Sequence, residues 1–375
     1  MRWLFVSDFL PEESSGAAGS LIAIARALEH LGHRVDFEWK DPRPHRIPHA
    51  TAARLLELGR RQRRQVEARL AAQSYDVVTV SQPFAYSVFE RVAPRFPGTL
   101  FLNRTHGWEA RLYEAQRRFA WDGRTSPGLA ARVSAALTQR ACRRAAQSAA
   151  GVIAASTRCA EWIRARYQLP ADRAVAIPYG LDATDAAAHR PRSGDRIRLL
   201  YVGNYLPLKG SSVLEAVLPN IGRRFPTVTL TLVVDRASRD EAHERFRPVF
   251  GERVTVESWL ERRHLMERYA SHDVFLFPSL FEGFGKAWLE AMAFGLCVVG
   301  FDEGGLRDVA RHGEEALYCA AGDGGALERL LAQVLESPEQ AFQIGERARA
   351  RVQSFTWERT ARETAAFAER LRAGR

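Results

Sequence analysis

Short apolar runs recur along the chain, and the stretches between them carry hydrophobic residues at helical spacing. Continuous apolar runs of this kind are typical of strands that are buried on both faces of a parallel sheet. The alternation of strands and helices therefore predicts an α/β protein built from doubly wound, Rossmann-like sheets. The predicted strands lie at 2–7, 34–37, 75–81, 99–103 and 151–155 in the first half, and at 197–202, 228–234, 274–277 and 296–301 in the second.

The pattern divides the chain into two halves of similar construction. At 375 residues the chain is long enough for two domains that each bury a core of their own. The segment 183–196 is rich in alanine, proline and charge and has no periodicity, so we interpret it as a linker. We therefore predict one domain over residues 1–182 and a second over residues 197–355.

The net charge of +10 comes mostly from arginine and raises the question of a partner. Nucleic acid, an anionic membrane surface and a phosphorylated substrate would all be attracted, and arginine-rich codon usage is a further explanation. The charge is dense in the predicted helix 54–70, where Leu55, Leu58 and Val66 could form an apolar stripe. Such a helix suits anionic lipid, although we favour a solvated helix face.

Cysteine usage and hydropathy restrict the compartment. The four cysteines show no C-x-x-C spacing, which argues against a disulfide framework or a zinc site and fits a reducing environment. No apolar run approaches the length of a membrane-spanning helix. Residues 1–8 are too short and too acidic for a signal peptide and predict a first strand. We expect a cytoplasmic protein.

The stretch 278–293 carries the richest chemistry. The predicted strand 274–277 is cut by a proline, and a helix is predicted to begin at Lys286. In the loop between them, Gly283 and Gly285 allow a tight turn and a close approach of a ligand to the backbone amides. These amides lie at the positive end of the helix, which suits hydroxyl or phosphate oxygens.

Two acidic residues frame this loop. Glu282 stands in the loop, and Glu290 lies one to two turns into the predicted helix. Two carboxylates so placed could hold two ends of an extended, hydroxyl-rich ligand. The alternative is that Glu282 caps the helix while Glu290 is a solvated surface charge.

The pattern E-G-F-G-x-x-x-L-E-A-M-A, which contains both acids, resembles the signature of glycosyltransferase family 4. Members of that family are retaining enzymes of the GT-B fold, in which two Rossmann-like domains face each other across a cleft. The resemblance implies that Glu282 contacts the donor sugar and Glu290 the ribose hydroxyls of a nucleotide diphosphate sugar. It also assigns the donor to the loop residues Gly283, Phe284, Gly285 and Lys286.

Further segments match the same family. Residues 203–210 correspond to its G-R-x-x-x-x-K-G pattern, whose arginine and lysine neutralise the donor diphosphate. Lys209 matches, whereas Asn204 replaces the arginine, so we expect Arg104 or helix amides to supply the missing positive charge. Residues 356–375 resemble the closing helix of the family, which crosses back onto the first domain.

The first domain contributes the acceptor side by the same resemblance. His106 follows the predicted strand 99–103, where a catalytic group sits in such a fold. It matches the H-G motif of the family, whose histidine points at the donor sugar, although a lone histidine is more often structural. Gly16 matches the glycine-rich loop near the donor phosphates and the acceptor. Tyr179 replaces the asparagine of a P-N-G-V-D motif.

The resemblance implies transfer of a sugar to an acceptor hydroxyl with retention of configuration. The expected catalytic residues are His106, Glu282 and Lys209. Lys209 and helix amides would take the part that a metal ion plays in other folds. No D-x-D motif stands in a suitable place, so we expect neither a metal nor a cofactor besides the donor substrate. We prefer front-face attack, in which the leaving phosphate oxygen accepts the acceptor's proton, over double displacement.

Three other functions remain as alternatives. Nucleotide-sugar epimerases share the architecture and need an acid–base set at the sugar C2, whereas phosphorylases use bound phosphate or pyridoxal. A basic nucleic-acid-binding protein belongs to a different class, but the basic residues are spread along the chain without a recognition motif, so we expect no nucleic acid. The expected acceptor is a glycan, a glycolipid or a small molecule. A lipid-linked acceptor would place the protein at the inner face of an anionic membrane.

Overall fold

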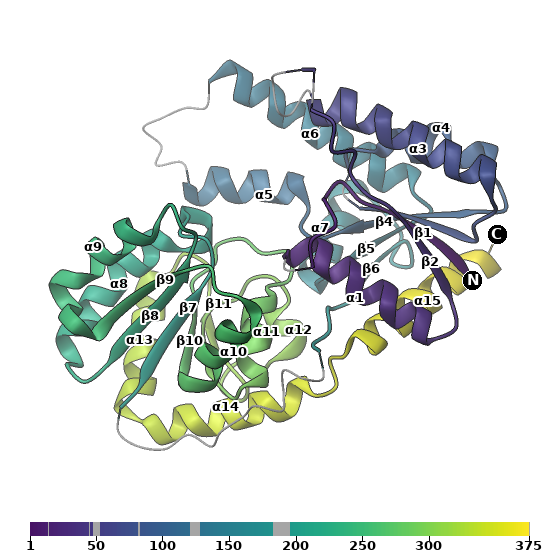
Figure 1. The fold of residues 1–375 in the computed structure, drawn as a ribbon. Helices are drawn as coiled ribbons and strands as arrows, with labels where there is room; N and C mark the ends of the chain where they lie inside the picture. Colours follow the sequence, from purple (N-terminus) through teal and green to yellow (C-terminus); the bar gives the residue numbers. More distant parts are fainter. Residues whose placement is uncertain are drawn as a thin grey trace. The chain divides into compact units, whose positions relative to one another are not determined.

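The computed structural model describes residues 1–13, 15–44, 46–47, 53–81, 83–120, 128–182 and 196–374. These residues form two compact α/β units (Figure 1). Unit 1 comprises Met1–Glu114, Trp121–Gly180 and Trp357–Arg375, and unit 2 comprises Ala115–Ala120 and Leu181–Thr356. The linker predicted at 183–196 lies outside the described residues except for its last position.

Unit 1 is built on a six-stranded parallel sheet. Its strands are β1 (Arg2–Val6), β2 (Arg34–Glu38), β3 (Val77–Ser81), β4 (Leu100–Thr105), β5 (Gly151–Ala154) and β6 (Ala174–Ala176). They are arranged in the order β2-β1-β3-β4-β5-β6, and every pair is parallel. All residues of β3, β4 and β5 are buried, because helices cover both faces of the sheet. The order reverses beside β1, which is the switch point of a doubly wound sheet.

The helices of unit 1 include one that the chain adds after completing unit 2. Those helices are α1 (Gly16–His30), α3 (Gly59–Ala72), α4 (Tyr86–Arg91), α5 (Glu109–Ala115), α6 (Leu129–Ser148), α7 (Thr157–Tyr167) and α15 (Trp357–Ala373), with the short turns η1 (Ala53–Leu58) and η2 (Ala93–Arg95). α15 packs against α1 and β4. It approaches β5 so closely that a Cβ on Gly151 would lie 2.7 Å from atoms of both Phe367 and Leu371. The helix α15 thus completes the core of unit 1.

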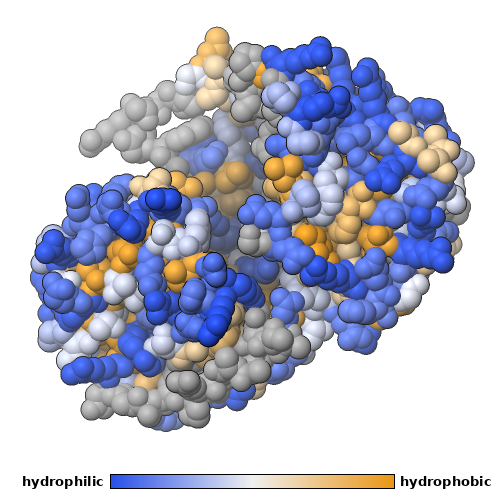
Figure 2. Space-filling model, in the orientation of Figure 1, coloured by the Kyte–Doolittle hydropathy of each residue, from blue (hydrophilic) through white to orange (hydrophobic). Residues whose placement is uncertain are grey.

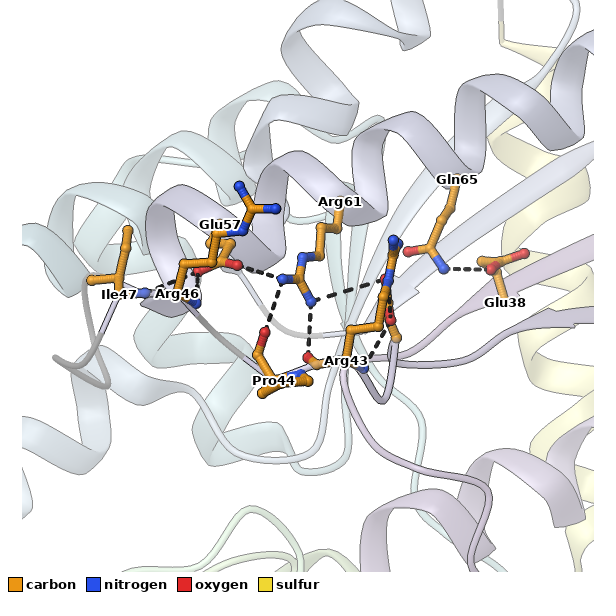
Figure 3. Close-up of polar contacts among 9 residues, drawn as sticks. Glu38, Arg43, Pro44, Arg46, Ile47, Glu57, Arg61 and Gln65 are labelled. Atoms are coloured by element: carbon orange, nitrogen blue, oxygen red, sulfur yellow. Dashed lines mark hydrogen bonds and ion pairs between the residues drawn. The ribbon is translucent and has the colours of Figure 1, made fainter.

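The basic segment 54–70 forms η1 and most of α3, and its Arg61 and Glu57 make polar contacts within unit 1 (Figure 3). Arg61 donates hydrogen bonds to the carbonyl oxygens of Arg43 at 2.9 Å and Pro44 at 3.0 Å. It also pairs with Glu57. This arginine therefore fastens the loop that follows β2 to the helix.

Two of the three residues of the apolar stripe predicted on this segment are not available to lipid, and the side chain of the third, Leu55, lies outside the described part of the chain. Leu58 and Val66 are 2% and 0% exposed. Val66 packs into a core cluster with residues of β1, β3 and β4. The lipid-facing interpretation is therefore wrong for these two residues, because the helix turns its apolar side toward the sheet. Arg60 and Arg64 are exposed, as a solvated outer face requires.

Unit 2 contains a second six-stranded parallel sheet in the order β12-β11-β10-β7-β8-β9. Its strands are β7 (Arg198–Val202), β8 (Thr229–Val234), β9 (Val254–Ser258), β10 (Val274–Phe277), β11 (Cys297–Phe301) and β12 (Leu317–Cys319). The order reverses between β7 and β10, so the loops that follow these two strands lie beside each other at the carboxyl edge. The prediction of two doubly wound parallel sheets is confirmed.

Helices cover the sheet of unit 2 on both faces (Figure 1). They are α8 (Ser211–Arg224), α9 (Arg239–Phe250), α10 (Arg262–Ser271), α11 (Lys286–Ala293), α12 (Leu306–Val309), α13 (Gly324–Glu336) and α14 (Pro338–Val352), with the short turns η3 (Gln116–Ala120), η5 (Pro207–Lys209) and η6 (Gly251–Arg253). Within the described residues of both units, no helix combines the length and the apolar character that crossing a bilayer requires.

Candidate functional site

Lys209 and Glu282 meet at the switch point of unit 2. Lys209 ends η5, in the loop after β7, and Glu282 lies in the loop after β10. The distance from Lys209 Nζ to Glu282 Oε1 is 2.6 Å, and Ser279 Oγ donates to the same oxygen at 3.1 Å. The two side chains are 33% and 15% exposed. The pair is therefore open to a ligand and yet partly desolvated, which strengthens its electrostatic interactions.

Close backbone packing brings the two loops together. The Leu280 amide donates to the Leu208 carbonyl at 2.9 Å. Gly210 has φ of 89°, and a Cβ at this position would lie 2.3 Å from the Pro278 carbonyl oxygen. Only glycine satisfies both the backbone angle and the space. The glycine of the K-G pair is thus required by the fold, whatever the lysine binds.

Asn204 lies in the same loop with an exposed side chain. The Tyr201 hydroxyl donates to the carbonyl oxygens of both Asn204 (2.9 Å) and Lys209 (3.3 Å) and so holds the loop from beneath. Burial raises the pKa of Tyr201 well above its usual value, so the hydroxyl keeps the proton that it donates. Because Asn204 is neutral, Lys209 carries the positive charge of this loop.

Phe284 anchors the glycine-rich loop from within. Its ring is 2% exposed and packs against Trp288 with 5.1 Å between ring centroids. Its carbonyl oxygen accepts hydrogen bonds from the Trp288 indole at 3.0 Å and from the Gly305 amide at 2.9 Å. Two of its neighbours were also predicted to contact the donor: Gly283 is buried, and Lys286 is partly exposed at the start of α11. These contacts hold the loop against α11 and the segment that contains Gly305.

Replacing Gly285 with alanine is expected to lower the free energy of unfolding by about 2–4 kcal/mol, from a left-handed backbone and a collision in a packed site. Gly285 has φ of 98°, and a Cβ there would lie 2.2 Å from Trp288 Nε1. Gly313 is the matched control, since it has φ of 82° with no atom within 4 Å of its Cβ position. Urea unfolding of Gly285→Ala and Gly313→Ala separates the cost of the left-handed backbone, which both variants carry, from the cost of the collision, which arises only in Gly285→Ala. Equal losses of unfolding free energy in the two variants would contradict the collision.

Both carboxylates of the motif are engaged by other side chains. Glu282 pairs with Lys209, and the residue directly before α11 is Gly285, which has no side chain to cap the helix. The Glu290 side chain is 7% exposed and accepts hydrogen bonds from Arg262 Nη1 at 2.7 Å and the Tyr269 hydroxyl at 3.2 Å. Glu290 is therefore not a solvated charge.

Arg262 and Tyr269 were not anticipated from the sequence. Both belong to α10, and they reach Glu290 on α11 only because unit 2 packs these helices together. No spacing along the chain signals this contact. A ribose that binds Glu290 would have to share the carboxylate with both side chains.

His106 follows β4 in unit 1 and is enclosed by aromatic rings. Its Nδ1 lies 2.5 Å from the Tyr179 hydroxyl, and its ring meets Phe9 edge-on with 5.8 Å between centroids. Burial and, secondly, the positive charge of Arg104 lower the pKa of His106 to about 3, so the imidazole is neutral at physiological pH. Its Nε2 is buried and has no hydrogen-bond partner among the described residues.

Arg104 is buried and contacts the C-terminal helix. It is 1% exposed, and its Nη2 donates to Thr364 Oγ1 of α15 at 2.6 Å. Burial lowers the pKa of this guanidinium to about 10. The Arg104 side chain is thus enclosed by unit 1 and faces α15, an arrangement that does not favour the expected contact with a phosphate.

Gly16 begins α1 behind Ser15, whose hydroxyl caps the helix by accepting from the Ala18 amide at 3.4 Å. Gly16 is exposed, and a Cβ at this position would meet no protein atom within 4 Å. The position that the fold does restrict is Gly19, where a Cβ would lie 2.2 Å from the Glu13 carbonyl oxygen. A requirement for glycine at position 16 would thus come from a ligand.

The predicted site residues fall into two groups. The structure brings together Asn204, Lys209 and Glu282 with the loop 283–286 in unit 2, and Glu290 lies on the following helix. Gly16, Arg104 and His106 belong to unit 1.

Comparisons with known proteins extend over both units. A family model described as Glycosyltransferase Family 4 matches residues 14–185, and one described as Glycosyl transferases group 1 matches residues 183–351. Glycogen synthase of Mycobacterium tuberculosis (strain CDC 1551 / Oshkosh) is 33% identical over 193 residues, which cover 50% of this chain and 46% of the relative. The phosphatidyl-myo-inositol mannosyltransferase of Mycolicibacterium smegmatis is 31% identical over 201 residues, 51% of each chain. The matched region spans about half the length of these relatives.

Among solved structures, sucrose-phosphate synthase from Thermosynechococcus elongatus has a TM-score of 0.77 at 22% identity, with both chains covered completely. The two family models follow each other along the chain and leave only its ends unmatched. The signature residues of the sequence, the two parallel sheets and these matches agree. The chain belongs to the glycosyltransferases of family 4, also described as group 1, and has their GT-B fold.

Proposed function

We propose that this protein transfers a sugar from a nucleotide diphosphate sugar to an acceptor hydroxyl with retention of configuration. The observation that carries the proposal is the pair of Lys209 and Glu282, 2.6 Å apart on the two loops at the switch point of unit 2. A cation and a carboxylate side by side can hold a diphosphate and the sugar attached to it. Within family 4, this chain retains both groups at the positions of the family motif.

Departure of the diphosphate is the step that needs positive charge. When the anomeric C–O bond breaks, negative charge gathers on the phosphate oxygen. Lys209 Nζ and the first turn of α8, which begins at Ser211, would stabilise that charge. Asn204 is neutral and adds none, and the Arg104 side chain is enclosed within unit 1. We propose that lysine and helix amides perform this task without a metal ion.

The acceptor would attack from the face that the diphosphate leaves. Its hydroxyl proton would pass to the departing phosphate oxygen, while Glu282 accepts hydrogen bonds from the sugar hydroxyls. A double displacement needs an available carboxylate as nucleophile. Glu290 is 7% exposed and engaged by two side chains, and Glu282 is paired with Lys209. These contacts favour front-face attack.

The test begins with thermal unfolding in the presence of UDP, GDP, ADP or TDP, because a ligand of the folded state raises its melting temperature. The stabilising nucleotide then selects the sugar donors for assay with and without glycan and lipid acceptors, in EDTA. We expect consumption of the donor to depend on the acceptor and to be unaffected by EDTA. Conversion without an acceptor would indicate an epimerase, dependence on phosphate would indicate a phosphorylase, and no stabilisation by any nucleotide would oppose the proposal.

We further propose that unit 1 contacts an anionic membrane through the first half of α6. Leu129, Val133 and Leu137 are 77%, 49% and 45% exposed, and their spacing places them on one face of the helix. Figure 2 shows hydrophobic residues in orange at the outer end of α6. The helix contains no acidic residue, and its Arg132 and Arg140 are exposed. Apolar side chains flanked by arginines suit anionic lipid.

Changing Leu129, Val133 and Leu137 together to serine is expected to lower binding to phosphatidylglycerol vesicles at least about tenfold, since three apolar side chains no longer enter the lipid. Flotation with phosphatidylglycerol or phosphatidylcholine vesicles measures the effect. The control is Leu10→Ser, which removes an equally exposed leucine (51%) outside α6. Equal binding to neutral vesicles, or equal losses in both variants, would contradict this contact surface.

A further inference from the structure

Tyr179 stands beside His106 at a position where the family motif has asparagine. Its hydroxyl lies 2.5 Å from His106 Nδ1, and the tyrosine is 4% exposed. The two residues lie far apart in sequence, so their contact depends on the fold of unit 1. An asparagine side chain is too short to occupy the same space, so the substitution changes what His106 contacts.

The C-terminal helix α15 holds Tyr179 in place. Trp357, its first residue, packs against the Tyr179 ring with 5.9 Å between centroids. Thr360 Oγ1 donates to the Pro178 carbonyl oxygen at 2.8 Å. On its other side, the His106 ring meets Phe9. The imidazole is thus confined between two aromatic rings, one of which α15 fixes.

The chemistry of the two groups favours one direction for the hydrogen bond between them. Burial raises the pKa of Tyr179 well above its usual value, so the phenol stays protonated, and the neighbouring positive charge of Arg104 polarises its O–H bond. A neutral imidazole nitrogen without a proton is a good acceptor, and its ring then carries the proton on the other nitrogen. In His106 that other nitrogen is Nε2, which is buried and without a hydrogen-bond partner among the described residues.

We propose that Tyr179 is a positioning residue that donates to Nδ1, fixes His106 as the Nε2–H tautomer and thereby makes it a hydrogen-bond donor to an oxygen of the donor sugar. The consequence for catalysis rests on the proposed function, whereas the tautomer does not. A buried N–H group without a partner is unfavourable, and a sugar oxygen placed at Nε2 removes that cost. The histidine therefore acts through a donated hydrogen bond and not as a general base.

The tautomer is measured directly in the full chain with ¹⁵N-labelled histidine, by long-range ¹H–¹⁵N spectra that distinguish a protonated from an unprotonated ring nitrogen. The His106 signals are those absent from His106→Gln. We expect a single Nε2–H tautomer in the wild type and a mixture, or the Nδ1–H form, in Tyr179→Phe. The control Tyr167→Phe removes another buried phenol of unit 1, which accepts from the Trp108 indole at 3.0 Å, and should leave His106 unchanged. An Nδ1–H wild type, or an unchanged tautomer in Tyr179→Phe, would overturn the proposal.

The catalytic consequence is tested by steady-state kinetics of the same variants. We expect Tyr179→Phe to lower kcat by about 10- to 100-fold, as a misplaced reacting group does, with little change in the KM of the donor. A loss of folding would instead reduce the active fraction and leave kcat per active site unaltered. If Tyr179→Phe changed the tautomer of His106 but kept the wild-type kcat, the proposed effect of the tautomer on catalysis would be overturned. Absence of any transferase activity would refute the proposed function while the spectra still decide the tautomer.

Discussion

Lys209→Met is expected to lower turnover by about 100- to 1000-fold, the loss that follows removal of a group stabilising transition-state charge. The departing diphosphate would lose the positive charge of its loop, because Asn204 is neutral at the position where the family has arginine. Methionine keeps the length and the apolar part of the side chain. The measurement is the initial rate of transfer at saturating donor, for the donor identified by thermal unfolding.

Lys40→Met is the control for this prediction. Lys40 follows β2 in unit 1, where its backbone amide donates to the Phe9 carbonyl at 3.2 Å, and it takes no part in the proposed mechanism. We expect wild-type turnover in this variant. A Lys209→Met protein as active as Lys40→Met would show that the diphosphate is stabilised elsewhere.

Glu282→Gln is expected to reduce turnover by about 100- to 1000-fold while the chain remains folded. Glutamine can still accept the hydrogen bond from Ser279 Oγ, but it lacks the charge that orients Lys209 and attracts the sugar hydroxyls. Single-turnover measurements would place the loss in the chemical step.

Glu90→Gln provides a matched control for Glu282→Gln. Glu90 pairs with Arg144 at side-chain exposures of 22% and 35%, close to the 15% and 33% of Glu282 and Lys209. Both changes break one half-exposed ion pair, which is worth little to stability. We therefore expect Glu282→Gln and Glu90→Gln to have similar melting temperatures, with turnover reduced only in Glu282→Gln. Equal turnover in the two variants would show that Glu282 has no part in the mechanism. Since Lys209 and Glu282 touch, their double variant should lose less than the sum of the single losses in activation free energy.

The strands that cross the centre of each sheet could be predicted because burial on both faces demands continuous apolar runs. β3 and β10 are examples, since every residue in both is buried. The edge strands β6 and β12 are only three residues long and carry no such signal. The loops that carry Lys209 and Glu282 could be placed because their glycines and their lysine follow strands at the switch point of a doubly wound sheet.

Other features depend on contacts that no local pattern reveals. β4 continues through Thr105, beyond the predicted end at residue 103, and this extension directs Arg104 toward α15. The contacts of Glu290 with Arg262 and of His106 with Tyr179 join distant segments. The two basic helices are a similar case: α3 and α6 both pair apolar positions with arginines, but only the packing of unit 1 decides that α3 buries Val66 while α6 exposes Leu129 and Val133.

The place of α15 in unit 1 has a consequence for the order of events during protein synthesis. A ribosome makes residues 181–356, and with them all but a short turn of unit 2, before it makes the helix that closes the core of unit 1. Until that helix is made, the nascent first unit exposes an apolar surface around Gly151, against which Phe367 and Leu371 later pack. We infer that unit 2 can complete its folding while the ribosome is still translating, whereas the earlier unit matures last and depends more on protection by chaperones.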